Sequence, residues 1–162
     1  YVMIDMHQDV YGAAVGGNGA PDWACRTNGA APISLPGGTP WWLKNIDPTV
    51  INSWINFWSY TQHKDLQDHY IMVWQKLAAR FKNNPYVLGY DLMNEPWGGD
   101  VIKVFLTGEF ERVQLAAFYN RLIPALRNTD PNKYIFFEPT PAPVTFGAPS
   151  NLSKITDTRS SS

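Results

Sequence analysis

Three carboxylates in this 162-residue chain stand at or just beyond the ends of short apolar runs. They are Asp9, Glu95 and Glu138, and a proline follows each of the two glutamates. Because proline cannot donate a ladder hydrogen bond, each glutamate marks a point where a strand would stop. A lone glutamate in such a place usually faces water, whereas one held against a substrate can donate or accept a proton. Which of these two situations applies depends on the elements that position the carboxylates.

The apolar runs that precede the carboxylates predict strands, and the spacing of other apolar residues predicts helices. The strands are expected at 1–6, 86–92 and 134–137, and the helices from Pro48 onward, over 64–81 and over 109–127. Asp47 before Pro48 is a typical helix start, an N-cap followed by proline at the first helical position. Trp54 and Trp58 fall on the apolar stripe of the first helix, so we expect them in the core.

The order strand, helices, strand, helix, strand predicts an α/β fold with a parallel sheet covered by helices. Candidate polar groups at the carboxyl ends of such strands are typical of an α/β barrel. Three strands cannot close an eight-stranded barrel, which needs about 250 residues. We therefore interpret residues 1–162 as an incomplete catalytic domain, a partial (β/α)8 barrel. A doubly wound sheet is the competing architecture, but no glycine-rich phosphate loop follows any strand.

The connection 8–47 carries no helical periodicity and is rich in Gly and Pro. Long connections without secondary structure are uncommon in a domain unless they are functional, so we expect an active-site loop that Trp41 and Trp42 close. At the other end of the chain, residues 158–162 are predicted to be a polar tail.

Composition excludes several classes of protein. The net charge of −1 does not favour nucleic-acid binding, and there is no apolar run long enough for a transmembrane helix. His63 and His69 have no carboxylate or cysteine partners at ligand spacing, so neither a metal site nor a cofactor is expected. The single Cys25 says little about the compartment, and Asn151-Leu152-Ser153 is a glycosylation sequon that weakly favours secretion.

Two stretches together resemble glycoside hydrolase family 5, and within it the endoglycoceramidases. They are Asp5–Tyr11 and Tyr90–Gly99, which resemble the third and fourth strand ends of those enzymes, and Gly17–Ala24 between them is also similar. The resemblance implies that the chain spans about strands 3 to 5 of the barrel. It makes Glu95 the general acid/base.

The resemblance also implies roles for the neighbours of Glu95. Asn94 would bind the sugar 2-hydroxyl, His7 and Asp9 would bind hydroxyls of the glucose at the cleavage point, and Trp41 would add to that subsite. The nucleophilic glutamate of this family lies on the seventh strand and would be outside the chain. Glu138 is expected to bind substrate or to pair with another residue rather than to replace that nucleophile.

These roles predict a retaining β-glycosidase that hydrolyses the bond between oligosaccharide and ceramide in glycosphingolipids. The alternatives are a family 5 β-glucanase or other β-glycosidase, and an inactive truncated sugar-binding protein. The expected partners are a glycosphingolipid or a β-linked oligosaccharide, with transient contact to a membrane surface. An extracellular or lysosome-like location is expected.

Overall fold

The three predicted strands form one parallel sheet. The computed structural model describes residues 1–157, so the predicted tail at 158–162 lies outside the described residues. The strands are β1 (Val2–Asp5), β2 (Val87–Asp91) and β3 (Tyr134–Phe136), in the order β1-β2-β3 across the sheet. The prediction of a parallel α/β sheet is confirmed.

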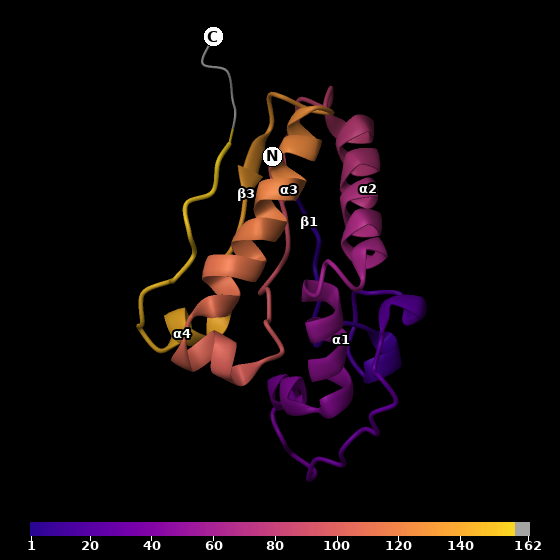
Figure 1. Ribbon diagram of the computed structural model, residues 1–162. Coiled ribbons are helices and arrows are strands. Elements are labelled where there is room, and N and C mark those ends of the chain that lie inside the picture. The colour runs from indigo at the N-terminus through magenta and orange to yellow at the C-terminus, as the bar shows by residue number, and fades with distance from the viewer. Residues whose placement is uncertain (158–162) are drawn as a thin grey trace.

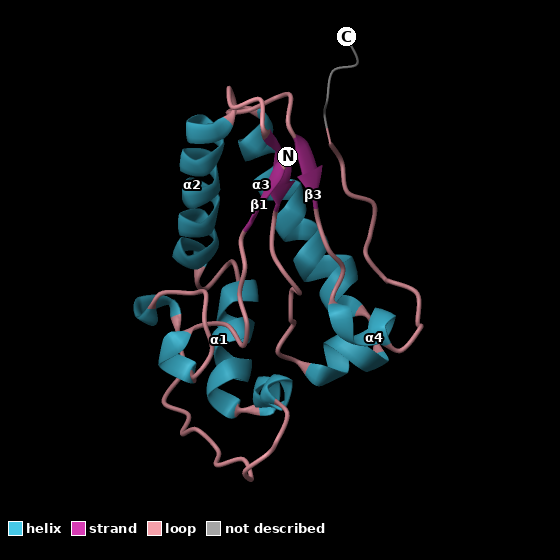
Figure 2. Cartoon of the chain, turned by 180° about the vertical axis from the view of Figure 1, so that it is seen from behind, coloured by secondary structure: helices cyan, strands magenta, loops and turns pink. Residues whose placement is uncertain are grey.

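Both long helices lie on the same face of this sheet. The helices are α1 (Pro48–Trp58), α2 (Lys64–Phe81), α3 (Ala116–Arg127) and the short α4 (Pro141–Thr145). Figure 1 shows α2 and α3 in front of the strands, and the reverse view of Figure 2 shows the strands in front. Parallel strands paired in sequence order, joined by right-handed crossovers, place every connecting helix on one side. This is the arrangement of an α/β barrel and not of a doubly wound sheet, which carries helices on both faces.

The predicted helix starts follow local signals. The side chain of Asp47 accepts hydrogen bonds from the backbone N–H and the hydroxyl of Thr49, which caps α1 as expected. Trp54 and Trp58 of α1 are buried and stacked with ring centroids 5.8 Å apart, so their assignment to the core is confirmed. α2 has the bounds that its apolar spacing predicts.

The helix predicted over 109–127 is correct only in its second part. Its first part is a π-helical stretch, Phe110–Leu115, and α3 continues from Ala116. A second π-helical segment, Ile102–Leu106, and the short α4 have no counterpart in the prediction. The π-helix is rare and is defined by its i→i+5 hydrogen bonds, so it was not part of the prediction.

Strands of a parallel sheet are usually buried on both faces, but two of the three strands are not buried in this chain. Tyr1 beside β1 and Tyr134 at the start of β3 have exposed fractions of 96% and 55%. Within the described residues the helices cover one face of the sheet, and β1 and β3 are its edge strands. Only β2 is largely buried, because it alone has a strand on each side and both long helices over it.

The connection between β1 and α1 contains local structure in its first and last parts. It contains three 3-10 turns, at Ala13–Val15, Asp22–Ala24 and Trp41–Ile46. Residues 9 and 18 pair as an isolated antiparallel bridge, so the loop folds back onto the end of β1. This brings a part of the loop to the sheet edge where the candidate residues lie.

Candidate active site

The carboxyl ends of the three strands meet at one edge of the sheet. Asp5 of β1 pairs with Asp91 of β2, and Asp91 pairs with Phe136 of β3. Beyond the strands, the N–H of Asn94 donates to the carbonyl of Met6 at 3.3 Å. The two segments with the proposed chemistry therefore run side by side past the end of the regular sheet.

Glu95 sits on this edge with an exposed side chain and an unusual backbone. Its φ of 45° lies in the left-handed region, which non-glycine residues seldom adopt. Its N–H donates to Oε2 of Glu138 at 2.9 Å, and its carbonyl accepts from Nε2 of Gln8 at 3.2 Å. The structure thus brings two of the three predicted carboxylate residues, Glu95 and Glu138, into direct contact.

Asn94 is half-buried and joins the two strand ends. Its side-chain Nδ2 donates to the backbone carbonyl of Gln8 at 3.0 Å and lies 3.4 Å from Nε2 of His7. The amide is fixed in orientation because it binds backbone on the neighbouring segment. A fixed amide next to Glu95 is a suitable partner for a substrate hydroxyl.

His7 lies between two carboxylates. Its Nδ1 is 2.8 Å from Asp5 and its Nε2 is 3.5 Å from Asp9. The hydrogen bond to Asp5, with the negative charges of Asp5 and Asp9, raises the pKa of His7 above its usual value. The imidazole is exposed, so both it and Asp9 can reach a ligand at this edge.

Asp9 and Trp41 share an open hollow of about 550 Å³. Asn18 and Lys44 also line it, and the side chain of Asn18 donates to Oδ2 of Asp9 at 3.2 Å. The indole of Trp41 is 59% exposed, which leaves a flat apolar surface beside polar groups. Such a combination suits a sugar ring, whose faces are apolar and whose rim carries hydroxyls.

The five predicted site residues therefore form one continuous region. His7, Asn94 and Glu95 lie together at the strand ends, and Asp9 links them to Trp41 in the hollow. Their roles as acid/base and substrate ligands stay predictions.

Two further residues of this region were not predicted from the sequence as site residues. Gln8 donates from Nε2 to the carbonyls of Asn94 and Glu95 and accepts the N–H of Tyr11 at Oε1. Its place in the string between His7 and Asp9 is the only signal for it. Asp91 is the other, and its signal is a charged residue inside an otherwise apolar strand.

Asp91 is buried, and its Oδ1 has no hydrogen-bond partner among the described residues. Burial, together with the negative charges of Glu138 and Asp5, raises the pKa of Asp91 to about 6. The carboxyl is therefore protonated in the folded protein at a pH where the unfolded chain has already released that proton.

This pKa predicts a pH-dependent contribution of Asp91 to stability. The contribution is fully present below the unfolded pKa of about 4 and is lost as the pH rises through about 6, by up to about 3 kcal/mol. We expect Asp91→Asn to gain stability relative to the parent between pH 5 and pH 7.5, measured by thermal unfolding at each pH. The exposed Asp22→Asn is the control, and an Asp91→Asn difference that is the same at both pH values would contradict the prediction.

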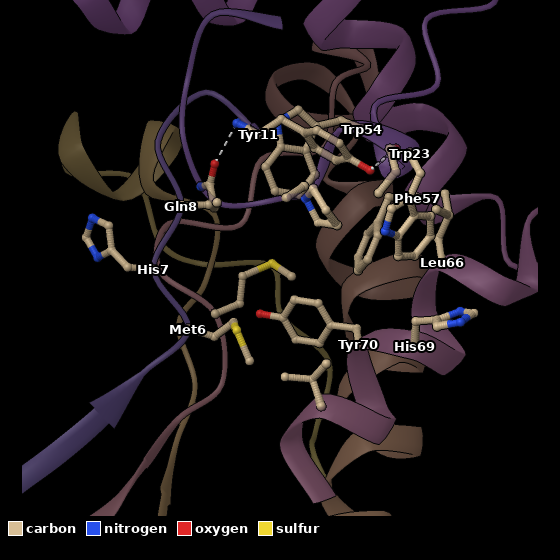
Figure 3. Close-up of a pocket in the computed structure, with 16 residues that line it drawn as sticks. Met6, His7, Gln8, Tyr11, Trp23, Trp54, Phe57, Leu66, His69 and Tyr70 are labelled. Atoms are coloured by element: carbon tan, nitrogen blue, oxygen red, sulfur yellow. Dashed lines mark hydrogen bonds between the residues drawn. The ribbon is translucent and has the colours of Figure 1, made fainter. Parts of the chain in front are cut away.

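A second, mostly apolar cavity of about 260 Å³ lies beside β1, α1 and α2, and His7 and Gln8 are among its lining residues. Figure 3 shows aromatic and aliphatic side chains, among them Trp54, Phe57 and Tyr70, gathered around it, while the ring of His7 points away. The carboxylates of Asp9, Glu95 and Glu138 do not line it. Its composition favours a packing role, and the candidate chemistry lies on the His7 side of the strand end.

The described residues, 1–157, contain no group of three or more His, Cys, Asp or Glu side chains that could hold a metal ion. Within the same range, no helix is both long and apolar enough to cross a membrane.

Parallel strands in barrel order, with polar side chains gathered at their carboxyl edge, are the arrangement of an α/β-barrel enzyme. The family model described as cellulase, glycosyl hydrolase family 5, matches residues 1–142. The chain belongs to this family, and the predicted family and partial barrel are confirmed.

Individual proteins that resemble this chain carry more specific names than the family does. The endoglycoceramidase of Hydra vulgaris is 32% identical over 85% of this chain, and endoglycoceramidase I of Rhodococcus hoagii is 34% identical over 94%. The structure of endo-glycoceramidase II from Rhodococcus sp. in complex with ganglioside GM3 superposes with a TM-score of 0.89 at 38% identity, and covers 99% of this chain. The chain spans 31%, 30% and 37% of these three proteins, about a third of each.

Proposed function

We propose that the protein carrying this chain is a retaining endoglycoceramidase, which cleaves the β-glycosidic bond between oligosaccharide and ceramide. The observation that carries the proposal is the strand-end constellation of Asn94 and Glu95 against His7, in a chain that belongs to family 5. The similarity to proteins named endoglycoceramidase supports this substrate over a soluble β-glucan.

Glu95 acts first as acid and then as base. Protonated Glu95 gives its proton to the glycosidic oxygen as the C–O bond breaks, so the bonding electron pair leaves with ceramide as a neutral alcohol. A nucleophilic carboxylate bonds to the anomeric carbon from the opposite face. The ionised Glu95 then takes a proton from water, whose oxygen displaces that carboxylate and restores the β-configuration.

The nucleophile is proposed to come from sequence outside these 162 residues, about 5–5.5 Å from Glu95 as a retaining mechanism requires. Glu138 is less suited to that role, because one of its carboxylate oxygens already accepts the N–H of Glu95.

The remaining site residues are proposed to bind the sugar next to the cleaved bond. Asn94 would hold the 2-hydroxyl, a contact that strengthens as the transition state forms. His7 and Asp9 would bind other hydroxyls of that sugar, and Trp41 would stack against its face. The shared hollow of Asp9 and Trp41 supports this arrangement.

We also propose that the protein works at a membrane surface, outside the cell or in a lysosome-like compartment, in the breakdown of glycosphingolipids. Ceramide anchors such substrates in membranes, so the enzyme must approach the bilayer at least transiently. The exposed Asn151 of the glycosylation sequon supports passage through a secretory route.

The test is to incubate the whole protein with ganglioside GM3 and, separately, with a soluble β-glucan, and to identify the products by mass spectrometry. Endoglycoceramidase activity releases one intact oligosaccharide and ceramide. Hydrolysis of the glucan alone would assign a β-glucanase instead, and binding of GM3 without products would assign a sugar-binding protein.

A further inference from the structure

Glu138 is fixed to the backbone of Glu95 rather than left free in the site. Its Oε2 accepts the N–H of Glu95 at 2.9 Å, across 43 residues of sequence. Glu138 is itself held by its main chain, because the hydroxyl of the buried Tyr119 donates to its carbonyl at 2.9 Å. The carboxylate is therefore supported by the helix layer through α3.

The contact acts on a residue whose backbone is strained. A left-handed conformation is sterically disfavoured for an L-residue, and Glu95 adopts it with φ of 45°. The following Pro96 adds to the restriction, because a residue before proline is pushed toward extended conformations. Such a backbone persists only when its surroundings hold it in place.

Two side chains hold it from opposite sides. Glu138 takes the N–H of Glu95, and Gln8 donates to the carbonyl of the same residue at 3.2 Å and to that of Asn94 at 3.0 Å. Glu138 lies on the segment after β3, and Gln8 lies on the segment after β1. The direction in which the Glu95 side chain leaves the sheet edge is thus set from both neighbouring strands.

We propose that Glu138 is a positioning residue for Glu95, which keeps the left-handed turn that aims the acid/base at the glycosidic oxygen. The inference rests on the proposed function and adds a residue to that same site. Glu138 acts as a hydrogen-bond acceptor for a backbone N–H, so it does not itself exchange a proton or bond to the sugar.

A residue that aims the acid and a residue that only supports the fold differ in how their loss depends on the leaving group. Ceramide leaves as an alkoxide unless it is protonated, so it needs a well-aimed acid. A dinitrophenolate leaves without protonation. The value of kcat/KM in a retaining mechanism reports the steps up to the first bond cleavage, so it isolates the acid step from the later water attack.

The experiment measures kcat/KM of the whole protein on GM3 and on a dinitrophenyl β-glycoside, for the parent, Glu138→Leu, Glu138→Asp and Glu138→Gln. Loss of the acceptor in Glu138→Leu is expected to lower the GM3 value by about 10²-fold, the usual effect of misplacing a catalytic group by about 1 Å. The aryl glycoside value should change far less. Glu138→Asp is one methylene shorter and should show the same selectivity, while Glu138→Gln keeps an acceptor oxygen and should recover most of the loss.

Three outcomes would overturn the proposal. An unchanged GM3 value in Glu138→Leu would remove the role, and an equal loss on both substrates would indicate a purely structural effect. Complete loss on both substrates in Glu138→Gln would make Glu138 a reacting group. Thermal unfolding of each variant reports folding, and the aspartate and glutamine variants decide the matter if the leucine variant does not fold.

The experiments distinguish an error in the positioning role of Glu138 from an error in the proposed function. If Glu95→Gln still cleaves GM3, the proposed function is wrong. If Glu95 is needed and the Glu138 variants show no selectivity between the substrates, only the positioning role is wrong.

Discussion

Glu95→Gln is expected to lower kcat/KM on a glycosphingolipid by about 10²- to 10⁴-fold, the range that a positioned general acid contributes. Glutamine has nearly the shape of glutamate and can keep both backbone contacts, to Glu138 and to Gln8. It cannot deliver a proton to the leaving oxygen. The loss would therefore come from chemistry and not from a rearranged turn.

The measurement is the initial rate of oligosaccharide release from GM3, with thermal unfolding to show that the variant is folded. Glu109→Gln is a matched control, because it makes the same change in a glutamate whose side chain pairs with Lys103 at the surface. Such exposed pairs contribute little, so the control should retain the parent's rate. A Glu95→Gln variant as active as Glu109→Gln would remove Glu95 from the mechanism.

Trp74→Ala is expected to lower the free energy of unfolding by about 3–5 kcal/mol, the usual cost of removing a buried aromatic ring. Trp74 is fully buried in α2, and its ring meets that of Tyr90 edge-on, with centroids 5.7 Å apart. Its Nε1 also donates to the carbonyl of Leu92 at 3.1 Å. The substitution would leave a cavity under β2 and remove a bond just before the Asn94-Glu95 turn.

Urea or thermal unfolding of the whole protein measures the effect. Trp42→Ala removes the same side chain from an exposed position, 54% accessible, and should change stability by no more than about 0.5 kcal/mol. Equal destabilisation by the two substitutions would contradict the packing described for α2 and β2.

The amino-acid sequence determined the elements that depend on neighbours in the chain. Asp47 and Pro48 set the start of α1, and the apolar spacing set the bounds of α2, because caps and helical periodicity act within one or two turns. The strings Asp5–Tyr11 and Tyr90–Gly99 together indicated the family, which the match over residues 1–142 confirms. Such local signals can be recognised in the sequence without knowledge of the fold.

The tertiary structure decided what surrounds Glu95. Gln8 and Glu138 contact it from 87 and 43 residues away in sequence, and no local pattern encodes a contact over such separations. The raised pKa of Asp91 likewise requires its burial near Asp5 and Glu138, on neighbouring segments. The sequence determines which groups are present at the strand ends, and the register of the parallel strands determines which of them meet.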